Sequence, residues 1–91
     1  MASFQFTHPE NFDFKKPELW GKWFTRFQRF RSASGLHESD EEVQVNTLLY
    51  SMGSEADDIL TTLKLTDAKK KKWKDVTEAL GKYFIRKRNV V

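Results

Sequence analysis

The stretch that spans residues 41–60, EEVQVNTLLYSMGSEADDIL, constrains the fold of this chain more than any other part of it. Its apolar residues recur at the spacing of an amphipathic helix, and Gly53 interrupts the pattern once. Glycine adopts the left-handed conformation that commonly ends a helix, so the sequence predicts two helices that meet at a tight corner. The first should begin at Ser39, where Glu42 completes a capping box, and the second at Ser54.

An aromatic helix should precede this pair, between Pro17 and Gly35. Proline is favoured at the first position of a helix and glycine just beyond its last, and the large side chains between them fall on one face. A small bundle needs such large side chains for its core. However, the core of so small a domain does not always bury six of them, and those left exposed can form a binding surface. We therefore expect a core role and keep a peptide-binding groove as the alternative. The stripe consists of Leu19, Trp20, Trp23, Phe24, Phe27 and Phe30.

We predict an extended N-terminal arm over residues 1–15. Phe4 and Phe6 are two residues apart, as are Phe12 and Phe14. Side chains with this spacing point to the same side of a strand. Burying one phenylalanine is worth about 1.5–3 kcal/mol, so we expect Phe12 and Phe14 to dock the arm onto the helical body.

Two more helical segments should follow. Thr66 is placed to cap a short helical turn that ends near Lys71, and a last helix should begin at Asp75, with Glu78 completing a second capping box. No internal repeat or Pro- or Gly-rich linker divides the 91 residues. The sequence thus predicts an all-α domain, a small bundle of four to five helices over residues 16–91, preceded by the extended arm.

The residue types and their spacing do not indicate an enzyme, a metal site or a cofactor. The two histidines, His8 and His37, fall in the arm and in a loop, away from any expected partner. Asp57 and Asp58 are neighbours on a helix and diverge by about 100°, so they do not converge on one ion. The chain has no cysteine, no secretory signal and no apolar run of membrane-spanning length. We expect a cytoplasmic protein that does not contact membranes.

Charge divides the chain strongly. Residues 37–63 contain seven acidic residues and no Lys or Arg, whereas residues 64–91 contain ten basic and three acidic residues. Residues 69–74, KKKKWK, form a Lys-rich turn around Trp73. A basic patch with an interleaved aromatic is one pattern of nucleic-acid binding. The simpler interpretation, which we favour, is a solvated turn whose Trp73 anchors the last helix in the core.

Several short elements of the sequence occur together in one protein family. They are Phe12-Asp13-Phe14, Trp20 and Trp23, Leu48-Leu49-Tyr50 with Met52-Gly53, Ala56-Asp57-Asp58-Ile59, and Tyr83-Phe84 followed by Arg86-Lys87-Arg88-Asn89-Val90. In this order and spacing, from about residue 12 to the last residue, the chain resembles the N-terminal capsid lobe of gypsy-type retrotransposon Gag proteins. The domesticated Arc capsid lobe belongs to the same family.

The resemblance implies a structural domain of a longer Gag-like protein, with homo-oligomeric contacts in a virus-like shell. Alone, the lobe should associate only weakly, and RNA contact should be indirect or weak. The alternative is a domesticated lobe that binds a short peptide in a hydrophobic groove. The expected groove residues are Phe12, Phe14, Trp20, Trp23, Phe24 and Phe27. The expected assembly or RNA contacts are Lys69, Lys70, Lys71, Lys72, Lys74, Glu41 and Glu42.

Overall fold

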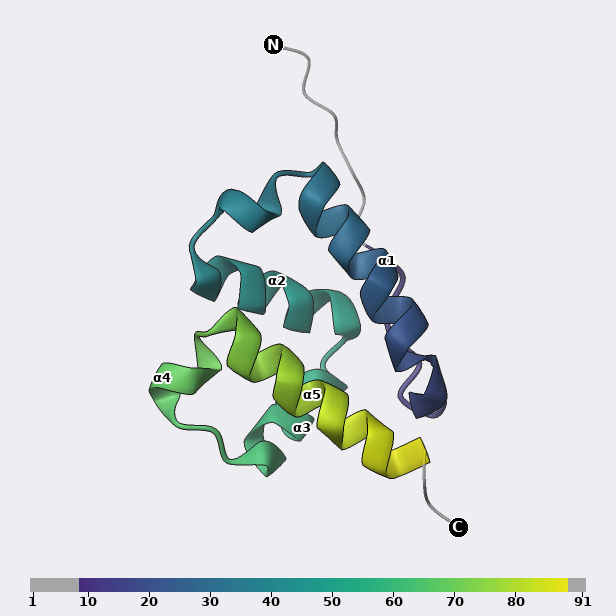
Figure 1. The fold of residues 1–91 in the computed structure, drawn as a ribbon. Helices are drawn as coiled ribbons and strands as arrows, with labels where there is room; N and C mark the ends of the chain where they lie inside the picture. Colours follow the sequence, from purple (N-terminus) through teal and green to yellow (C-terminus); the bar gives the residue numbers. More distant parts are fainter. Residues whose placement is uncertain (1–8, 89–91) are drawn as a thin grey trace.

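The computed structural model describes residues 9–88, and all regular structure in that range is helical. The elements are η1 (Pro17–Leu19), α1 (Trp20–Ala33), η2 (Leu36–Glu38), α2 (Glu41–Met52), α3 (Glu55–Leu63), α4 (Asp67–Lys70) and α5 (Trp73–Arg88), where η marks a 3₁₀ turn (Figure 1). The predicted all-α class is confirmed. Of the predicted arm, residues 9–13 have no helical structure, and Phe4 and Phe6 lie outside the described residues.

Helix α1 carries the aromatic stripe. Pro17 begins a 3₁₀ turn and the α-helix itself starts at Trp20, so the helical start at Pro17 is correct but its first turn is tighter than predicted. Gly35 follows the helix in the left-handed conformation, with φ +82°, as its position after the stripe predicted.

The corner between α2 and α3 lies where it was predicted, but its local geometry differs in two ways. Helix α2 begins at Glu41 with Asp40 at its N-cap, and no side chain caps it, so the predicted capping box of Ser39 and Glu42 is wrong. A 3₁₀ turn, η2, extends to residue 38, and Ser39 is the extended residue that ends it. Gly53 has φ +118° and ψ 166°, a region that is essentially restricted to glycine, rather than the left-handed helical region.

The last two helices combine one correct cap with one wrong start. The Thr66 hydroxyl accepts a hydrogen bond from the Lys69 amide at 3.2 Å and caps α4, as predicted. Helix α5 begins at Trp73 rather than Asp75, so the predicted Asp75–Glu78 capping box is wrong. The earlier start has a tertiary cause, because Glu41 of α2 accepts a hydrogen bond from the Trp73 amide at 3.0 Å.

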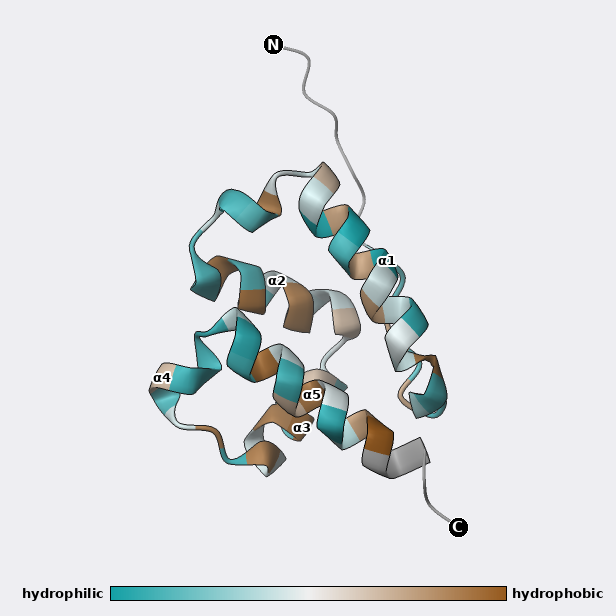
Figure 2. Cartoon of the chain, viewed as in Figure 1, coloured by the Kyte–Doolittle hydropathy of each residue, from teal (hydrophilic) through white to brown (hydrophobic). Residues whose placement is uncertain are grey.

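The core lies where α1, α2, α3 and α5 meet. Helix α5 contacts η1, α1, α2 and α4, and α2 packs against α3. Figure 1 shows α2 and α5 across the middle, α1 along one side and α4 at the far side. Figure 2 shows apolar residues on α2, α3 and α5 and a largely hydrophilic α4. The buried apolar residues are Phe12, Trp20, Phe27, Val45, Leu48, Leu49, Met52, Ala56, Ile59, Leu60, Val76, Leu80 and Phe84.

Candidate functional site

The segment that precedes η1 lies against the aromatic face of the bundle, with Phe12 at its centre. The Phe12 side chain is only 4% exposed. Its ring lies 4.9 Å from Phe84 and 5.7 Å from Trp20, measured between centroids, in edge-to-face arrangements that aromatic pairs favour. Phe14 packs 5.2 Å from Phe12 at the edge of the same cluster. Phe12 and Phe14 therefore dock this segment onto the helical body, as their spacing predicted.

Two hydrogen bonds add directionality to this docking. The Phe12 amide donates to the Met52 carbonyl at 3.1 Å, one residue before the corner at Gly53. The Trp23 indole N–H donates to the Glu10 carbonyl at 2.6 Å. A segment without helical structure is thus held by an apolar side chain and by its backbone, and proteins commonly bind peptides through these two kinds of contact.

All six residues predicted for a groove belong to this one aromatic cluster. Trp20 stacks on Phe24 and Trp23 stacks on Phe27, with centroid distances of 5.0 and 5.7 Å. Trp20, Phe27 and Phe12 are buried, and Trp23, Phe24 and Phe14 are partly buried against them. The stripe is therefore mainly core, and the chain's own segment covers the face where a groove was considered.

The Lys-rich turn is anchored by its tryptophan. The Trp73 ring stacks on Phe24 and Phe27, each with a centroid distance of 6.1 Å. The Arg31 guanidinium lies over the Trp73 ring at 4.3 Å from its centroid, a cation–π contact. Trp73 is therefore engaged within the fold, which matches the favoured interpretation and removes the interleaved aromatic from the nucleic-acid pattern.

One acidic and one basic residue that were predicted as assembly contacts, Glu41 and Lys72, contact each other within the chain. Glu41 Oε2 lies 3.8 Å from Lys72 Nζ, while Oε1 accepts the Trp73 amide hydrogen bond. Both side chains are about half exposed, so the ion pair contributes about 0–1 kcal/mol. Glu42 and the other lysines of the turn have no ionic partner among the described residues. Glu41 thus serves the fold, and Glu42 and Lys69, Lys70, Lys71 and Lys74 remain open to partners.

Gln44 is a structural residue that the sequence pattern did not single out. Its side chain is 4% exposed. Its amide nitrogen donates to the Ser39 carbonyl at 2.7 Å, and its amide oxygen accepts from Arg31 Nε at 2.7 Å. Partial burial lowers the pKa of the Arg31 guanidinium below its usual value. Arg31 and Gln44 together connect the end of α1, the start of α2 and Trp73.

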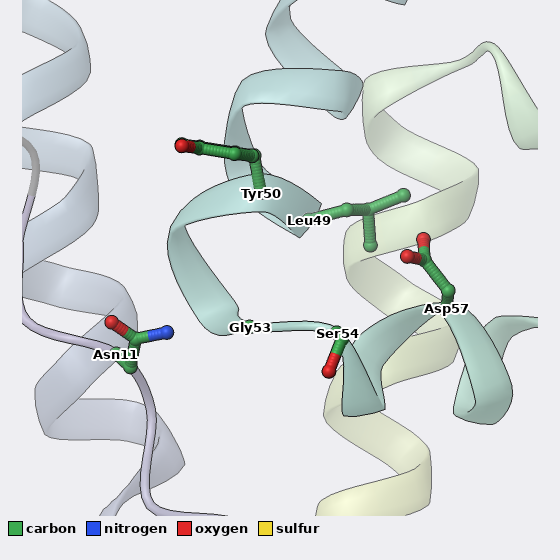
Figure 3. Close-up of a pocket in the computed structure, with 6 residues that line it drawn as sticks. All are labelled: Asn11, Leu49, Tyr50, Gly53, Ser54 and Asp57. Carbon is green, nitrogen blue, oxygen red and sulfur yellow. The ribbon is translucent and has the colours of Figure 1, made fainter.

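A cavity of about 500 Å³ lies at the α2–α3 corner, beside the docked segment. Its lining residues come from four parts of the chain: Asn11 of the docked segment, Leu49 and Tyr50 of α2, Gly53 and Ser54 of the corner, and Asp57 of α3. Figure 3 shows Asn11 on one side of Gly53 and Asp57 on the other. The sequence located the corner but not the cavity, because nothing local indicated that Asn11 would lie against Gly53.

Three polar side chains that line the cavity have no partner among the described residues. Ser54 stands at the N-cap position of α3 without making a side-chain cap. The side chains of Asn11, Ser54 and Asp57 have no hydrogen-bond or ionic partner among the described residues. Leu49, only 8% exposed, contributes an apolar surface. The arrangement supplies hydrogen-bond acceptors and one negative charge beside an apolar wall, which suits a cationic group with an aliphatic stem.

Comparison with protein-family models, curated proteins and solved structures found no match to this chain. Within residues 9–88, no helix is both long and apolar enough to cross a membrane, and no three acidic, histidine or cysteine side chains gather as a metal site would require. The family resemblance therefore stays a prediction from the sequence.

Proposed function

We propose that this chain is a structural capsid domain of the Gag type, whose function is homo-oligomeric contact within a shell. The proposal starts from the resemblance of residues 12–91 to gypsy-type capsid lobes. The observation that carries it further is where the elements of that resemblance lie in the fold. Phe12, Trp20 and Phe84 lie in the core, and Gly53 forms the corner between α2 and α3. Several residues that carry the resemblance thus also build the core of this all-helical body.

The charge distribution gives the domain surfaces for such contacts. Lys69, Lys71 and Lys74 of the Lys-rich turn are exposed, as are the acidic residues of α3, and neither group has an ionic partner in the described residues. Exposed ion pairs are individually weak and are screened by salt. A single contact between two copies should therefore be weak, and a shell would depend on many contacts made together.

The test compares assembly of the chain with that of two charge-reversed variants. One variant replaces Lys69, Lys71 and Lys74 with Glu. The matched control replaces Lys22, Arg26 and Arg29, the exposed basic residues of α1, with Glu and so makes the same charge change on another face.

Assembly is measured by sedimentation velocity over a concentration series at low salt and by negative-stain electron microscopy. The experiment is repeated in any longer protein that carries this domain. We expect concentration-dependent association of the native chain, lost in the first variant and kept in the control. The proposal is refuted if the chain stays monomeric at millimolar concentration and a longer protein that carries it forms no particles.

A second candidate is a peptide-binding module, and the docked segment favours it. A segment without helical structure already lies on α1 and the corner, through Phe12 and through hydrogen bonds that the Glu10 and Met52 carbonyls accept. A partner with a similar sequence would bind the same face after displacing the segment.

The test titrates a fluorescently labelled peptide that copies residues 9–15, PENFDFK, with the intact chain and measures binding by fluorescence anisotropy. The control peptide has serine in place of both phenylalanines. Only the native peptide should gain anisotropy, because Phe12 supplies the buried contact of this segment. No rise in anisotropy at millimolar concentration of the chain would exclude this candidate.

A further inference from the structure

The cavity at the α2–α3 corner and the Lys-rich turn lie at opposite ends of α2. Glu41, the first residue of α2, contacts Lys72 of the turn at 3.8 Å. Gly53, directly after the last residue of α2, lines the cavity. A helix of 12 residues is about 18 Å long, so the cavity and the turn of one chain are too far apart to meet. They can come together only between two copies.

The cavity has the chemistry of a receptor for an ammonium group. The Asp57 carboxylate and the Ser54 hydroxyl are acceptors without partners in the described part of the chain, whereas Asn11 turns its amide nitrogen toward Gly53 (Figure 3). Ser54 and Asp57 occupy the two positions of a capping box, yet Ser54 forms no such cap and stays available. A lysine ammonium has three donors, and its aliphatic stem can pack on Leu49.

The turn offers matching groups in a fixed position. Lys69, Lys71 and Lys74 are exposed. Among the described residues, the turn forms an ion pair only through Lys72, with Glu41, so these three lysines have no ionic partner there. Trp73, held by ring stacking, fixes the backbone from which these side chains extend. Residues 37–63, which supply most of the cavity, contain no Lys or Arg that would compete for Asp57 in the same segment.

We propose that the cavity binds a lysine side chain from the Lys-rich turn of a second copy. Each copy then carries one cavity and one turn at opposite ends of α2, so the contact is head-to-tail and can repeat. Contacts of this kind form closed rings or open filaments, depending on the rotation between neighbours. This inference rests on the proposed self-association and names the two surfaces that meet.

Disulfide trapping tests the contact directly, because the chain has no cysteine of its own. A Ser54→Cys chain is mixed with a Lys71→Cys chain that carries a size tag, and the mixture is oxidised at low salt. The mixed disulfide dimer is quantified on a non-reducing gel. In the control mixture, a tagged Gln28→Cys chain replaces the Lys71→Cys chain, since Gln28 is exposed on α1.

We expect several-fold more mixed dimer with Lys71→Cys than with Gln28→Cys, and a loss of this excess in 1 M salt, where the screening length is about 3 Å. Adding Asp57→Asn to the Ser54→Cys chain should also remove the excess. Adding Asp58→Asn, in the same turn of α3 but not lining the cavity, should not. Far-UV circular dichroism confirms that each variant is folded.

Equal yields in the two mixtures, or equal effects of Asp57→Asn and Asp58→Asn, would overturn the contact. Failure of this contact is distinguishable from failure of the proposed function. Concentration-dependent assembly without the trapped dimer would leave the domain a self-associating protein that uses another surface. Absence of any assembly would reject both.

Discussion

Replacing Phe12 with alanine should strongly destabilise the whole domain, although Phe12 lies outside every helix. The side chain is 4% exposed and its ring contacts four other aromatic rings, those of Phe14, Trp20, Trp23 and Phe84, at centroid distances of 4.9–5.9 Å. Truncating a buried phenylalanine to alanine typically costs about 3–5 kcal/mol.

The location of Phe12 in a terminal segment limits this loss. If the alanine variant cannot hold the segment, residues 9–14 detach and the bundle remains. The two hydrogen bonds from the Phe12 amide and the Trp23 indole are then lost as well, at about 0.5–1.5 kcal/mol each, while the detached residues regain conformational entropy. We therefore expect about 3 kcal/mol, at the lower end of the range. In a domain of this size that lowers Tm by about 12–24 °C.

Urea unfolding followed by circular dichroism and tryptophan fluorescence measures this loss. Phe12→Leu should lose clearly less than Phe12→Ala, and Gln28→Ala, at an exposed position of α1, should change stability by less than about 0.5 kcal/mol. Deleting residues 1–15 should destabilise the domain about as much as Phe12→Ala. If Phe12→Ala loses under about 1 kcal/mol and the deletion is harmless, the segment does not contribute to the core.

Three further substitutions test single features of the fold by the same unfolding assay. Gly53→Asn should lower the free energy of unfolding by about 1–3 kcal/mol, because φ +118° with ψ 166° suits only glycine. Gly35→Asn should cost clearly less, because asparagine tolerates the left-handed region at φ +82°. Equal losses of stability in the two variants would contradict this difference in backbone geometry. Ser51→Ala should raise stability by about 0.5–1 kcal/mol, because the Ser51 hydroxyl is buried without a hydrogen-bond partner. A clear loss would mean that this hydroxyl is bonded. Glu41→Ala should cost about 0.5–2 kcal/mol, since it removes the acceptor for the Trp73 amide, and Glu41→Gln, which keeps an acceptor, should recover most of it. Equal losses would assign the effect to the charge.

Local signals in the sequence predicted the parts of the fold that depend on local chemistry. The spacing of large residues located α1, Gly35 and Gly53 marked two helix ends, and Thr66 capped α4. In each case the residue and its partner are separated by only a few positions, so the pattern is visible along the chain.

The features that the sequence missed depend on residues far apart along it. Glu41 fixes the start of α5 from 32 positions away, and this contact explains why the local capping box at Asp75 was not used. Gln44 bonds Arg31 across 13 positions, and Asn11 completes the cavity at Gly53 only because Phe12 is docked. Such pairings follow from the packing of helices, which the local pattern of a single sequence does not specify.

The two long-range contacts of Glu41 and Trp73 also bear on how strong a contact between copies can be. They hold the backbone of the Lys-rich turn at the start of α5, so a partner does not have to order a free loop before it binds. The remaining gain is small, because exposed lysine–carboxylate pairs contribute about 0–1 kcal/mol each. A few such pairs would total about 4 kcal/mol at most, which corresponds to a Kd near 1 mM. One contact of this strength would leave the isolated domain largely monomeric at micromolar concentration.

In a ring each copy makes two such contacts, and a neighbouring site held nearby raises the effective concentration into the millimolar range. Assembly would then require both repetition and closure, and it would be sensitive to salt and to the loss of the Asp57 charge.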